Sequence, residues 1–472
     1  MATNDKKLGL GLLIALGIGS MIGGGIFNSP TDLIGKANPP AALIAWGVGG
    51  LGVLCLAMVF QMLSKKRPEL SGGIYSYAQA GFGKYFGFTS AWGYWAAAFL
   101  GNVSFFILFF KTLNSLFPDG KGLAPITIFI IGSVALWVIT AFILLGIKDA
   151  SILNAIVTIA KLIPLFLIVL LGVTVFNIAY FIVPNWQTLL ASTGETTSIF
   201  TQVSKAMGTI LWCFVGIEAA VVMSERAKSK LLVGKATVIA FFITLGVYAF
   251  VSSIAMGIVD AKGLADAATP LADVLEKTMI GSAGALIVKI GVMTSVFGAL
   301  ISWILLTAEI PYIAAKGGVF PKIVAKTNKN EIPFVSLLIT NGLTQIFLLS
   351  LLSDQLQNAY YTAYYIATST ILIPYLFSTL YGIKVSLEEK EYGINFIFSI
   401  LATIYACYVI YAVGILYLEL TLVIYAIGII PFIIAKRENK EKLKLYEIIL
   451  SAIIGCGGLY LVYMIATGKI TP

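Results

Sequence analysis

Long apolar runs, each close to the length of a membrane-spanning helix, recur along almost the whole chain. A helix needs about 20 apolar residues to cross a bilayer, whereas the strands of a membrane barrel are about 10 residues long and alternate in polarity. Of the 472 residues, 59% are hydrophobic and only 11% are charged, compared with about 25% charged residues in a soluble domain. The sequence therefore predicts an all-α integral membrane protein.

The apolar runs predict thirteen spans. Their expected ranges are 9–34, 40–63, 83–112, 123–146, 151–177, 199–225, 232–258, 280–314, 333–352, 357–384, 394–415, 417–435 and 446–467. The start of the chain leads into the first run without a small-residue cleavage site, so no cleaved signal peptide is expected. The longest polar connections, 178–198 and 315–332, are too short to fold alone. We expect residues 1–472 to form a single membrane domain.

Basic residues are distributed unequally between alternate loops. If the N-terminus is cytoplasmic, the cytoplasmic segments carry 20 of the 31 Lys and Arg residues, and the outer segments hold only Lys36, Lys121, Lys262, Lys277 and Lys469. This asymmetry follows the positive-inside rule and predicts a cytoplasmic N-terminus. It also accounts for the net charge of +9 without a nucleic-acid partner. If the thirteenth span crosses the membrane, the C-terminus lies outside, and if it is instead a surface helix, the C-terminus lies inside.

Several chemistries are disfavoured by the residue types. The chain has no histidine, and its four cysteines, Cys55, Cys213, Cys407 and Cys456, all lie in apolar runs without metal-ligand spacing. There is no convincing nucleophile and base pair for an intramembrane enzyme and no repeated filter motif for a channel. We therefore expect neither an enzyme nor a bound metal or cofactor.

Three consecutive glycines interrupt the first span, in the stretch GIGSMIGGGIFNSP from Gly17 to Pro30. Each glycine costs about 1 kcal/mol relative to alanine in a helix, so the run favours local unwinding. Unwound backbone at membrane depth is tolerated where it lines a cavity, and the N–H groups that begin the second half-helix suit a carboxylate. The alternative is that the glycines only allow two helices to pack closely.

A second candidate break lies five spans later, in GTILWCFVGIEAA, which contains Gly216 and the ionisable Glu218. Transporters with inverted repeats bind substrate between such paired discontinuous helices. Spans 1–5 (about 9–177) and 6–10 (about 199–384) are therefore expected to form two inverted repeats, with 394–467 peripheral. Residue-level similarity between the halves is not evident, so the symmetry is inferred from the two breaks alone.

Five ordered motifs resemble the amino acid–polyamine–organocation (APC) transporters. They are GSMIGGGIFNSP, SGGIYSYAQAGFG, SAWGYW, LWCFVGIEAA and ISWILLTAEIP. The resemblance runs from about residue 8 to the C-terminus and is strongest to the basic amino acid/polyamine antiporters, the arginine–ornithine type in particular. It implies a LeuT-like core of five-plus-five inverted repeats with discontinuous helices 1 and 6, and about 12–13 spans.

The resemblance also implies a set of substrate-binding positions. Relatives hold the substrate's α-carboxylate and α-amine at the unwound part of helix 1 and its side chain between helices 3, 6, 8 and 10. One relative that exchanges arginine for agmatine has serine at the position of Gly24, so the carboxylate contact here is expected to rest on backbone alone. Trp212 and Trp303 are expected to face the cationic side chain, although either tryptophan could instead be an interfacial residue. The expected substrate-binding residues are Ser20, Met21, Gly23, Gly24, Gly25, Ala97, Ala98, Asn102, Trp212, Val215, Trp303, Tyr365 and Thr368.

Three charged residues within the spans are candidates for gating or charge balance. Glu218 could neutralise the substrate or couple the gate, or it could form a structural hydrogen bond. Lys161 matches a position at which some relatives use a lysine in place of a sodium ion, and it could also carry a proton or reach the interface. Glu309 is expected to be structural or part of a gate.

The leading hypothesis is an antiporter that exchanges a cationic amino acid for its metabolic product by alternating access, with arginine and ornithine as the best pair. Alternatives are an exchanger of an amino acid for its decarboxylated amine (histidine/histamine, lysine/cadaverine, ornithine/putrescine or arginine/agmatine) and a proton-coupled permease. The expected location is a multi-pass bacterial cell membrane. The expected partners are the bilayer, small amino acids or amines and, as in some relatives, a second copy in a homodimer.

Overall fold

The computed structural model describes residues 8–70, 73–117, 122–146, 150–222, 227–353 and 355–469. Within these ranges the chain is helical, and its only strand-like pairings are two isolated bridges. The α-helices are α1 (Leu10–Met21), α2 (Gly24–Ile34), α3 (Pro39–Lys66), α4 (Ile74–Phe82), α5 (Lys84–Asn114), α6 (Pro125–Leu144), α7 (Ala150–Gly172), α8 (Ile178–Phe181), α9 (Ile199–Phe214), α10 (Ala219–Val222), α11 (Lys230–Met256), α12 (Ala261–Asp266), α13 (Pro270–Glu276), α14 (Gly281–Lys316), α15 (Phe334–Phe347), α16 (Leu356–Glu388), α17 (Ile394–Val413), α18 (Ile415–Glu438) and α19 (Leu445–Ala466).

Every predicted span contains a helix, although fewer helices satisfy a strict length criterion. Among the described residues, 10 helices are long and apolar enough to cross a membrane, and 11 do so if the bent pair α1 and α2 is one span. The two remaining predicted spans correspond to α7, whose side chains are only partly described, and to α9, which the second break shortens to 16 residues. The all-helical, multi-span fold predicted from composition is thus confirmed.

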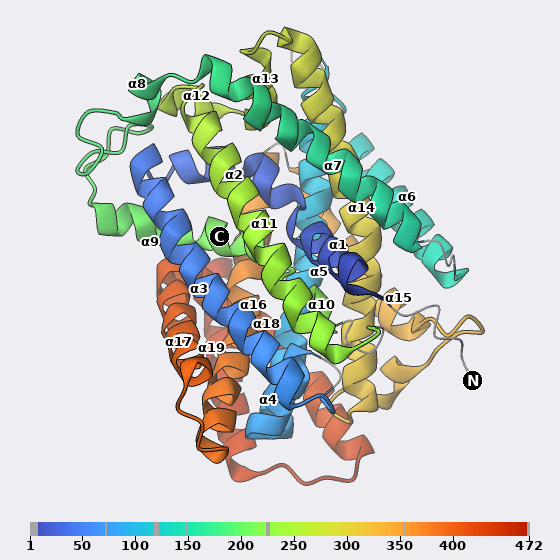
Figure 1. Ribbon diagram of the computed structural model, residues 1–472. Helices are drawn as coiled ribbons and strands as arrows, with labels where there is room; N and C mark the ends of the chain where they lie inside the picture. Colours follow the sequence, from blue (N-terminus) through green and yellow to red (C-terminus); the bar gives the residue numbers. More distant parts are fainter. Residues whose placement is uncertain are drawn as a thin grey trace.

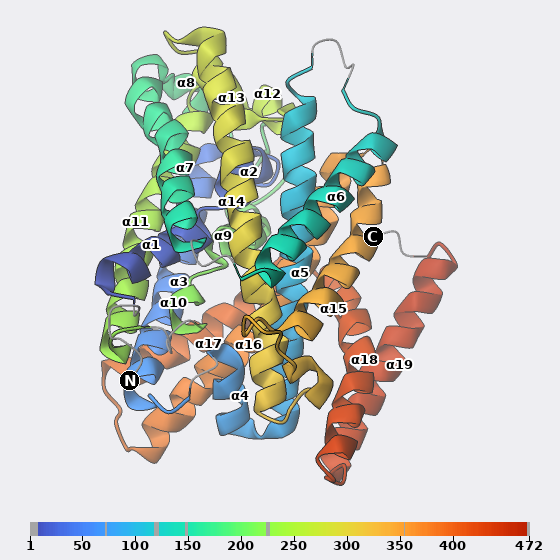
Figure 2. The ribbon, with the colours of Figure 1, turned by 90° about the vertical axis from the view of Figure 1, so that its right-hand side faces the viewer.

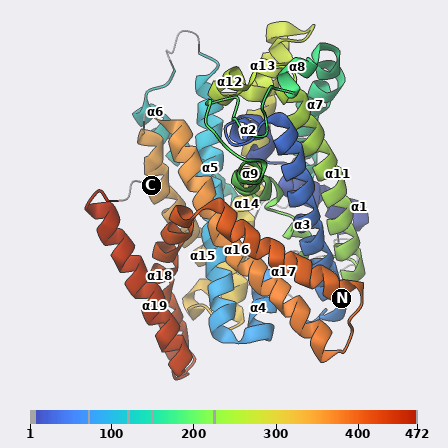
Figure 3. The same cartoon turned by 90° about the vertical axis from the view of Figure 1, so that its left-hand side faces the viewer.

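Most of the long helices run from one end of the bundle to the other, at differing tilts, and short elements lie at the two ends (Figure 1). The short helices α8, α12 and α13 gather at one end, which we call the α13 end, and α4 lies at the opposite end, the α4 end (Figure 2). The antiparallel pair α18 and α19 stands at the periphery, while α17 crosses α16 and α3 obliquely (Figure 3). This arrangement places α5, α14 and α16 around the two broken helices.

The first span breaks at its glycine run, as the sequence predicts. The axes of α1 and α2 differ by 42°, and Gly23 between them has φ −114° and ψ −138°, outside the helical region. The sixth span breaks between α9 and α10, where Gly216 has φ +109°. Only glycine adopts such a φ without strain, which explains why a glycine marks this break.

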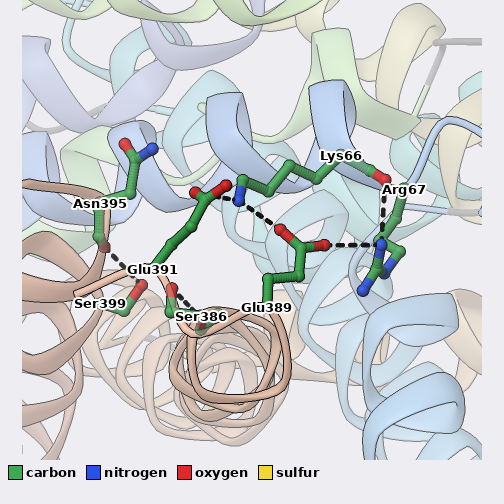
Figure 4. A network of polar contacts seen from close by, with 8 residues as sticks. Lys66, Arg67, Ser386, Glu389, Glu391, Asn395 and Ser399 are labelled. Atoms are coloured by element: carbon green, nitrogen blue, oxygen red, sulfur yellow. Dashed lines mark hydrogen bonds and ion pairs between the residues drawn. The ribbon is translucent and has the colours of Figure 1, made fainter. Parts of the chain in front are cut away.

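Ion pairs join helices at the α4 end. Lys66 at the end of α3 binds both Glu389 and Glu391, and Arg67 Nη1 lies 2.9 Å from Glu389 Oε1 (Figure 4). On the other side of this end, Lys436 contacts Glu447 at 3.0 Å and Glu441 at 3.3 Å, and Lys84 also binds Glu441. These contacts connect α3 to α16 and α5 to the α18–α19 pair. Five basic residues of the predicted loops, Lys6, Lys7, Lys121, Lys148 and Arg226, lie outside the described residues.

Candidate functional site

A cavity lies where the two broken helices meet α5, α14 and α16. It is lined by Ser20, Met21, Gly23, Gly24, Gly25, Ala97, Ala98, Gly101, Phe105, Trp212, Val215, Trp303 and Ile371. Ten of these thirteen residues belong to the set that the resemblance places around a substrate. Ser20 and Val215 are partly exposed and the other lining residues are buried, so the cavity is largely closed in this conformation.

The start of α2 presents backbone donors to the cavity. Gly23, Gly24 and Gly25 line it, and the first N–H groups of a helix have no partner within that helix. Those N–H groups and the helix dipole together form a ready site for an anion. A side chain at Gly24 would place its Cβ 2.5 Å from Leu108 Cδ2, and one at Gly25 would come within 3.3 Å of Trp212 Cδ1. The glycines therefore provide both the break and the space beside it.

The carbonyl groups at the end of α1 are occupied by protein donors. Lys161 on α7 is buried and its Nζ donates to the carbonyl of Gly19 at 2.6 Å. Tyr248 on α11 donates its hydroxyl to the carbonyl of Met21 at 2.6 Å. A cation at a helix C-terminus is favourable because the dipole is negative there. The break is thus stabilised on its carbonyl side, where the Gly23 N–H also donates to the Met21 carbonyl at 2.8 Å. Gly24 and Gly25, the first residues of α2, line the cavity.

The two breaks touch each other. A Cβ on Gly216 would lie 2.8 Å from both the carbonyl carbon and the carbonyl oxygen of Ser20, which is well inside normal van der Waals separation. Glycine is therefore required at position 216 for two independent reasons, its positive φ and the close approach of the two backbones.

Aromatic rings and small residues form the rest of the cavity wall. Trp212 on α9 lies 6.4 Å from the ring of Phe105 and 5.6 Å from that of Tyr364, and Trp303 on α14 is 5% exposed. Ala97, Ala98 and Gly101 on α5 leave room between these rings. Among the described residues that line the cavity, none is acidic. A cation in this cavity would have to be stabilised by aromatic faces.

Glu218 lies behind the second break and does not line the cavity. Its Oε2 accepts hydrogen bonds from the backbone N–H of Gly216 at 3.1 Å and from the Tyr375 hydroxyl at 2.6 Å. Tyr94 on α5 is a further neighbour of this carboxylate. Glu218 therefore ties the broken helix to α16 and lies beside α5, on the side of the cavity that faces the α4 end.

Four predicted residues lie elsewhere. Asn102 is fully buried one residue beyond Gly101 and contacts Thr307 Oγ1 at 3.4 Å. Tyr365 and Thr368 sit on α16 nearer the α13 end, where Thr368 hydrogen-bonds the carbonyl of Tyr364. Glu309 is partly exposed on α14 and does not line the cavity.

Three lining residues were not predicted. Gly101 and Phe105 follow Ala97 at intervals of four residues, so the helical period alone places them on the same face of α5. Ile371 could not be found in this way, because the sequence left the register of α16 open. Tyr248, which holds the first break, has no local sequence signal.

Comparison with known proteins agrees with this geometry. The profile of the amino acid permease family matches residues 8–470. The chain is 38% identical to the arginine/ornithine antiporter of Pseudomonas aeruginosa over 97% of this chain and 98% of the relative. It is 35% identical to an arginine/ornithine antiporter of Latilactobacillus sakei and 37% identical to an arginine/agmatine antiporter of Chlamydia felis, each over 98% of both chains. This chain belongs to the amino acid permease family of membrane transporters.

Proposed function

We propose that this protein is an antiporter that exchanges a cationic amino acid for its metabolic product, with arginine and ornithine as the preferred pair. The observation that carries the proposal is the cavity itself, which is lined by the glycines at the start of α2 and by two tryptophans, with no acidic residue among the described residues that line it. Two of the compared relatives are named arginine/ornithine antiporters, in agreement with this substrate class.

The two charged ends of a cationic amino acid match two parts of the cavity, the start of α2 and the pair of tryptophans. The α-carboxylate would accept hydrogen bonds from the N–H groups of Gly24 and Gly25 at the start of α2. The side-chain cation would lie against Trp212 and Trp303, where a desolvated cation–π contact contributes roughly 2 kcal/mol. The rest of the substrate would be enclosed by the remaining predicted lining residues, Ser20, Met21, Ala97, Ala98 and Val215. An amine without the carboxylate would leave the amides unoccupied, so this arrangement favours amino acids over decarboxylated amines.

Lys161 would act as a fixed cation at the break. Its ammonium binds the Gly19 carbonyl from α7, the position in which a bound metal cation would stabilise the same carbonyl end. Arginine and ornithine carry the same charge, so their exchange moves no net charge and needs no proton. We therefore assign Lys161 to holding the break, in preference to proton coupling.

Alternating access would require the cavity to open to each side in turn. We assign the α4 end to the cytoplasm because basic residues concentrate there, including the clusters at 65–67 and 436–444. Glu218, Tyr94 and Tyr375 would then lie on the cytoplasmic side of the cavity, and Trp212 with Tyr364 on the outer side. In this arrangement the group formed by Glu218, Tyr94 and Tyr375 would separate the substrate from the cytoplasm, and the group formed by Trp212 and Tyr364 would separate it from the outside.

Counterflow in proteoliposomes tests the proposal. Vesicles are preloaded with ornithine, arginine, lysine, agmatine or putrescine, and uptake of labelled arginine is followed without an ion gradient. We expect fast uptake with internal ornithine or arginine, little with the amines, and none with empty vesicles. Uptake driven by agmatine would reassign the protein to an amino acid/amine exchanger. Uptake into empty vesicles that depends on a proton gradient would reassign it to a proton-coupled permease.

A further inference from the structure

A second cluster of aromatic rings lies on α16 toward the α13 end, and it already holds a cation. The Lys36 ammonium lies 4.4 Å above the ring of Tyr365, and the rings of Tyr364 and Tyr361 are 5.9 and 6.0 Å away. Its Nζ also donates to Thr209 Oγ1 at 2.9 Å and to the Tyr364 hydroxyl at 3.2 Å. We call these four side chains, Thr209, Tyr361, Tyr364 and Tyr365, the outer cage.

The outer cage adjoins the cavity through Trp212. Tyr364 packs against Trp212 with ring centroids 5.6 Å apart, and Trp212 is itself a lining residue. On α16, Tyr365 precedes the lining residue Ile371 by six positions, which corresponds to about 9 Å along a helix axis. A ligand that leaves the cavity past Trp212 toward the α13 end would meet the outer cage next.

A buried carboxylate adds negative charge beneath the cage. Asp32 on α2 is 2% exposed and interacts electrostatically with Lys36 and Lys111. Asn28 bridges Asp32 and Lys111, through a 2.5 Å hydrogen bond to Asp32 Oδ1 and a 3.0 Å hydrogen bond from Lys111 Nζ. Tyr361 of the outer cage is a further polar neighbour of Asp32. This carboxylate favours retention of a cation at the cage.

Lys36 belongs to a connecting segment and not to a helix. It follows the end of α2 in the short connection to α3, and its side chain is only partly buried. Its ammonium sits on a flexible four-carbon stem. The cage is thus a cation site filled by a side chain from the connection between α2 and α3.

We propose that the outer cage is a second subsite for the terminal ammonium or guanidinium of a cationic amino acid, and that Lys36 occupies it when no substrate is there. This inference rests on the proposed function for the identity of the substrate. Incoming substrate displaces Lys36 on the outer side, and Lys36 returns to the cage after the substrate has passed Trp212. Lys36 is therefore a built-in competitor for substrate at the outer face only.

The test measures the KM for labelled arginine separately at each face, in right-side-out and inverted membrane vesicles loaded with ornithine. Lys36→Met removes the competing cation and keeps an apolar side chain of similar length. We expect the KM at the outer face to fall by roughly 3- to 30-fold, the range of one cation–π contact, and the KM at the inner face to stay unchanged. Lys36→Arg keeps a cation and should leave the KM at both faces close to that of the wild type.

Two further variants separate this mechanism from a structural effect. Lys262→Met removes an exposed lysine from the same end of the molecule and should not change the outer KM. Tyr365→Leu, introduced together with Lys36→Met, removes the cage face and should abolish the gain. If Lys36→Met does not reach the membrane, Lys36→Gln replaces it.

An outer KM that is unchanged or higher in Lys36→Met, while the wild type exchanges arginine normally, would overturn the subsite and leave the proposed function standing. The same fall in Lys262→Met would reduce the effect to surface charge and also overturn it. If the wild type exchanges no cationic amino acid at either face, the proposed function fails and the ligand assigned to the cage fails with it.

Discussion

Replacing Gly216 with alanine should damage the transporter at the contact between its two broken helices. The added Cβ would lie 2.8 Å from the backbone carbon and oxygen of Ser20 and 2.9 Å from its Cβ. Because two of these three atoms belong to the backbone, a side-chain rotation cannot relieve the clash. The alanine would also have to adopt φ +109°.

The expected cost has two parts. Holding a non-glycine residue at a strongly positive φ costs of order 1–3 kcal/mol, and inserting a methyl group into a packed contact typically costs about 1–3 kcal/mol. Together they predict a destabilisation of about 2–6 kcal/mol of this conformation. We expect a Tm lower by a few degrees in detergent and arginine exchange reduced by at least about tenfold, since 1.4 kcal/mol corresponds to a factor of ten in an equilibrium.

Gly246→Ala is the matched control. Gly246 lies inside α11, and a Cβ there would meet no atom within 4 Å. Alanine in a helix interior is favoured over glycine by about 1 kcal/mol, so this variant should be as stable as the wild type or more so. Wild-type Tm and exchange in Gly216→Ala would refute the contact between the breaks. Equal losses in both variants would show only that the protein tolerates no substitution at either glycine.

Three further outcomes are expected. Trp303→Leu should weaken arginine binding by roughly tenfold because it removes an aromatic face from the cavity. Isothermal titration measures the affinity, and Trp137→Leu is the control because Trp137 is exposed. Unchanged affinity in Trp303→Leu would remove Trp303 from the site. Glu218→Gln should slow exchange more than it weakens binding, because it loses the charged acceptor that ties the break to Tyr375; exchange at the wild-type rate would make Glu218 part of the scaffold only. The hydrogen bond from Lys66 lowers the pKa of Glu389 below its ordinary value, so the ion pairs in Figure 4 stabilise the fold above the ordinary glutamate pKa and are lost as the pH falls through the lowered one. Thermal unfolding between about pH 7 and pH 3 should therefore show a smaller drop in Tm for Glu389→Gln than for the wild type, and parallel curves would contradict the assignment.

The helix breaks could be predicted from the sequence because their causes are local. Three adjacent glycines weaken a helix wherever it packs, and an acid within an apolar run is costly enough in a membrane to mark a pathway or a paired site. Both breaks occur where these residues lie. The inverted-repeat relation between 9–177 and 199–384 stays a prediction, as does a homodimer.

Contacts between residues that meet only through tertiary packing were harder to predict from the sequence. Tyr365 and Thr368 were expected in the cavity, but the register of α16 presents Ile371 there instead. That register depends on how α16 packs against α5, and no periodic pattern within α16 specifies it. Tyr248 reaches the Met21 carbonyl across 227 residues of sequence separation. The sequence indicates only that Lys36 lies in a loop, because the three tyrosines around it come from a distant helix, α16.

The helix α16 contributes residues to the outer cage, to the cavity and to the contact with Glu218. It carries Tyr365 in the outer cage, Ile371 at the cavity and Tyr375 against Glu218, and the ten residues from Tyr365 to Tyr375 span about 15 Å of helix. A tilt of α16 about the level of Ile371 therefore moves its two tyrosines in opposite directions. A tilt that drew Tyr365 away from Lys36 would therefore shift Tyr375 in the opposite direction, and a tilt that drew Tyr375 away from Glu218 would shift Tyr365 in the opposite direction. One helix would then keep the two gates from opening together, which is the requirement that separates an exchanger from a channel.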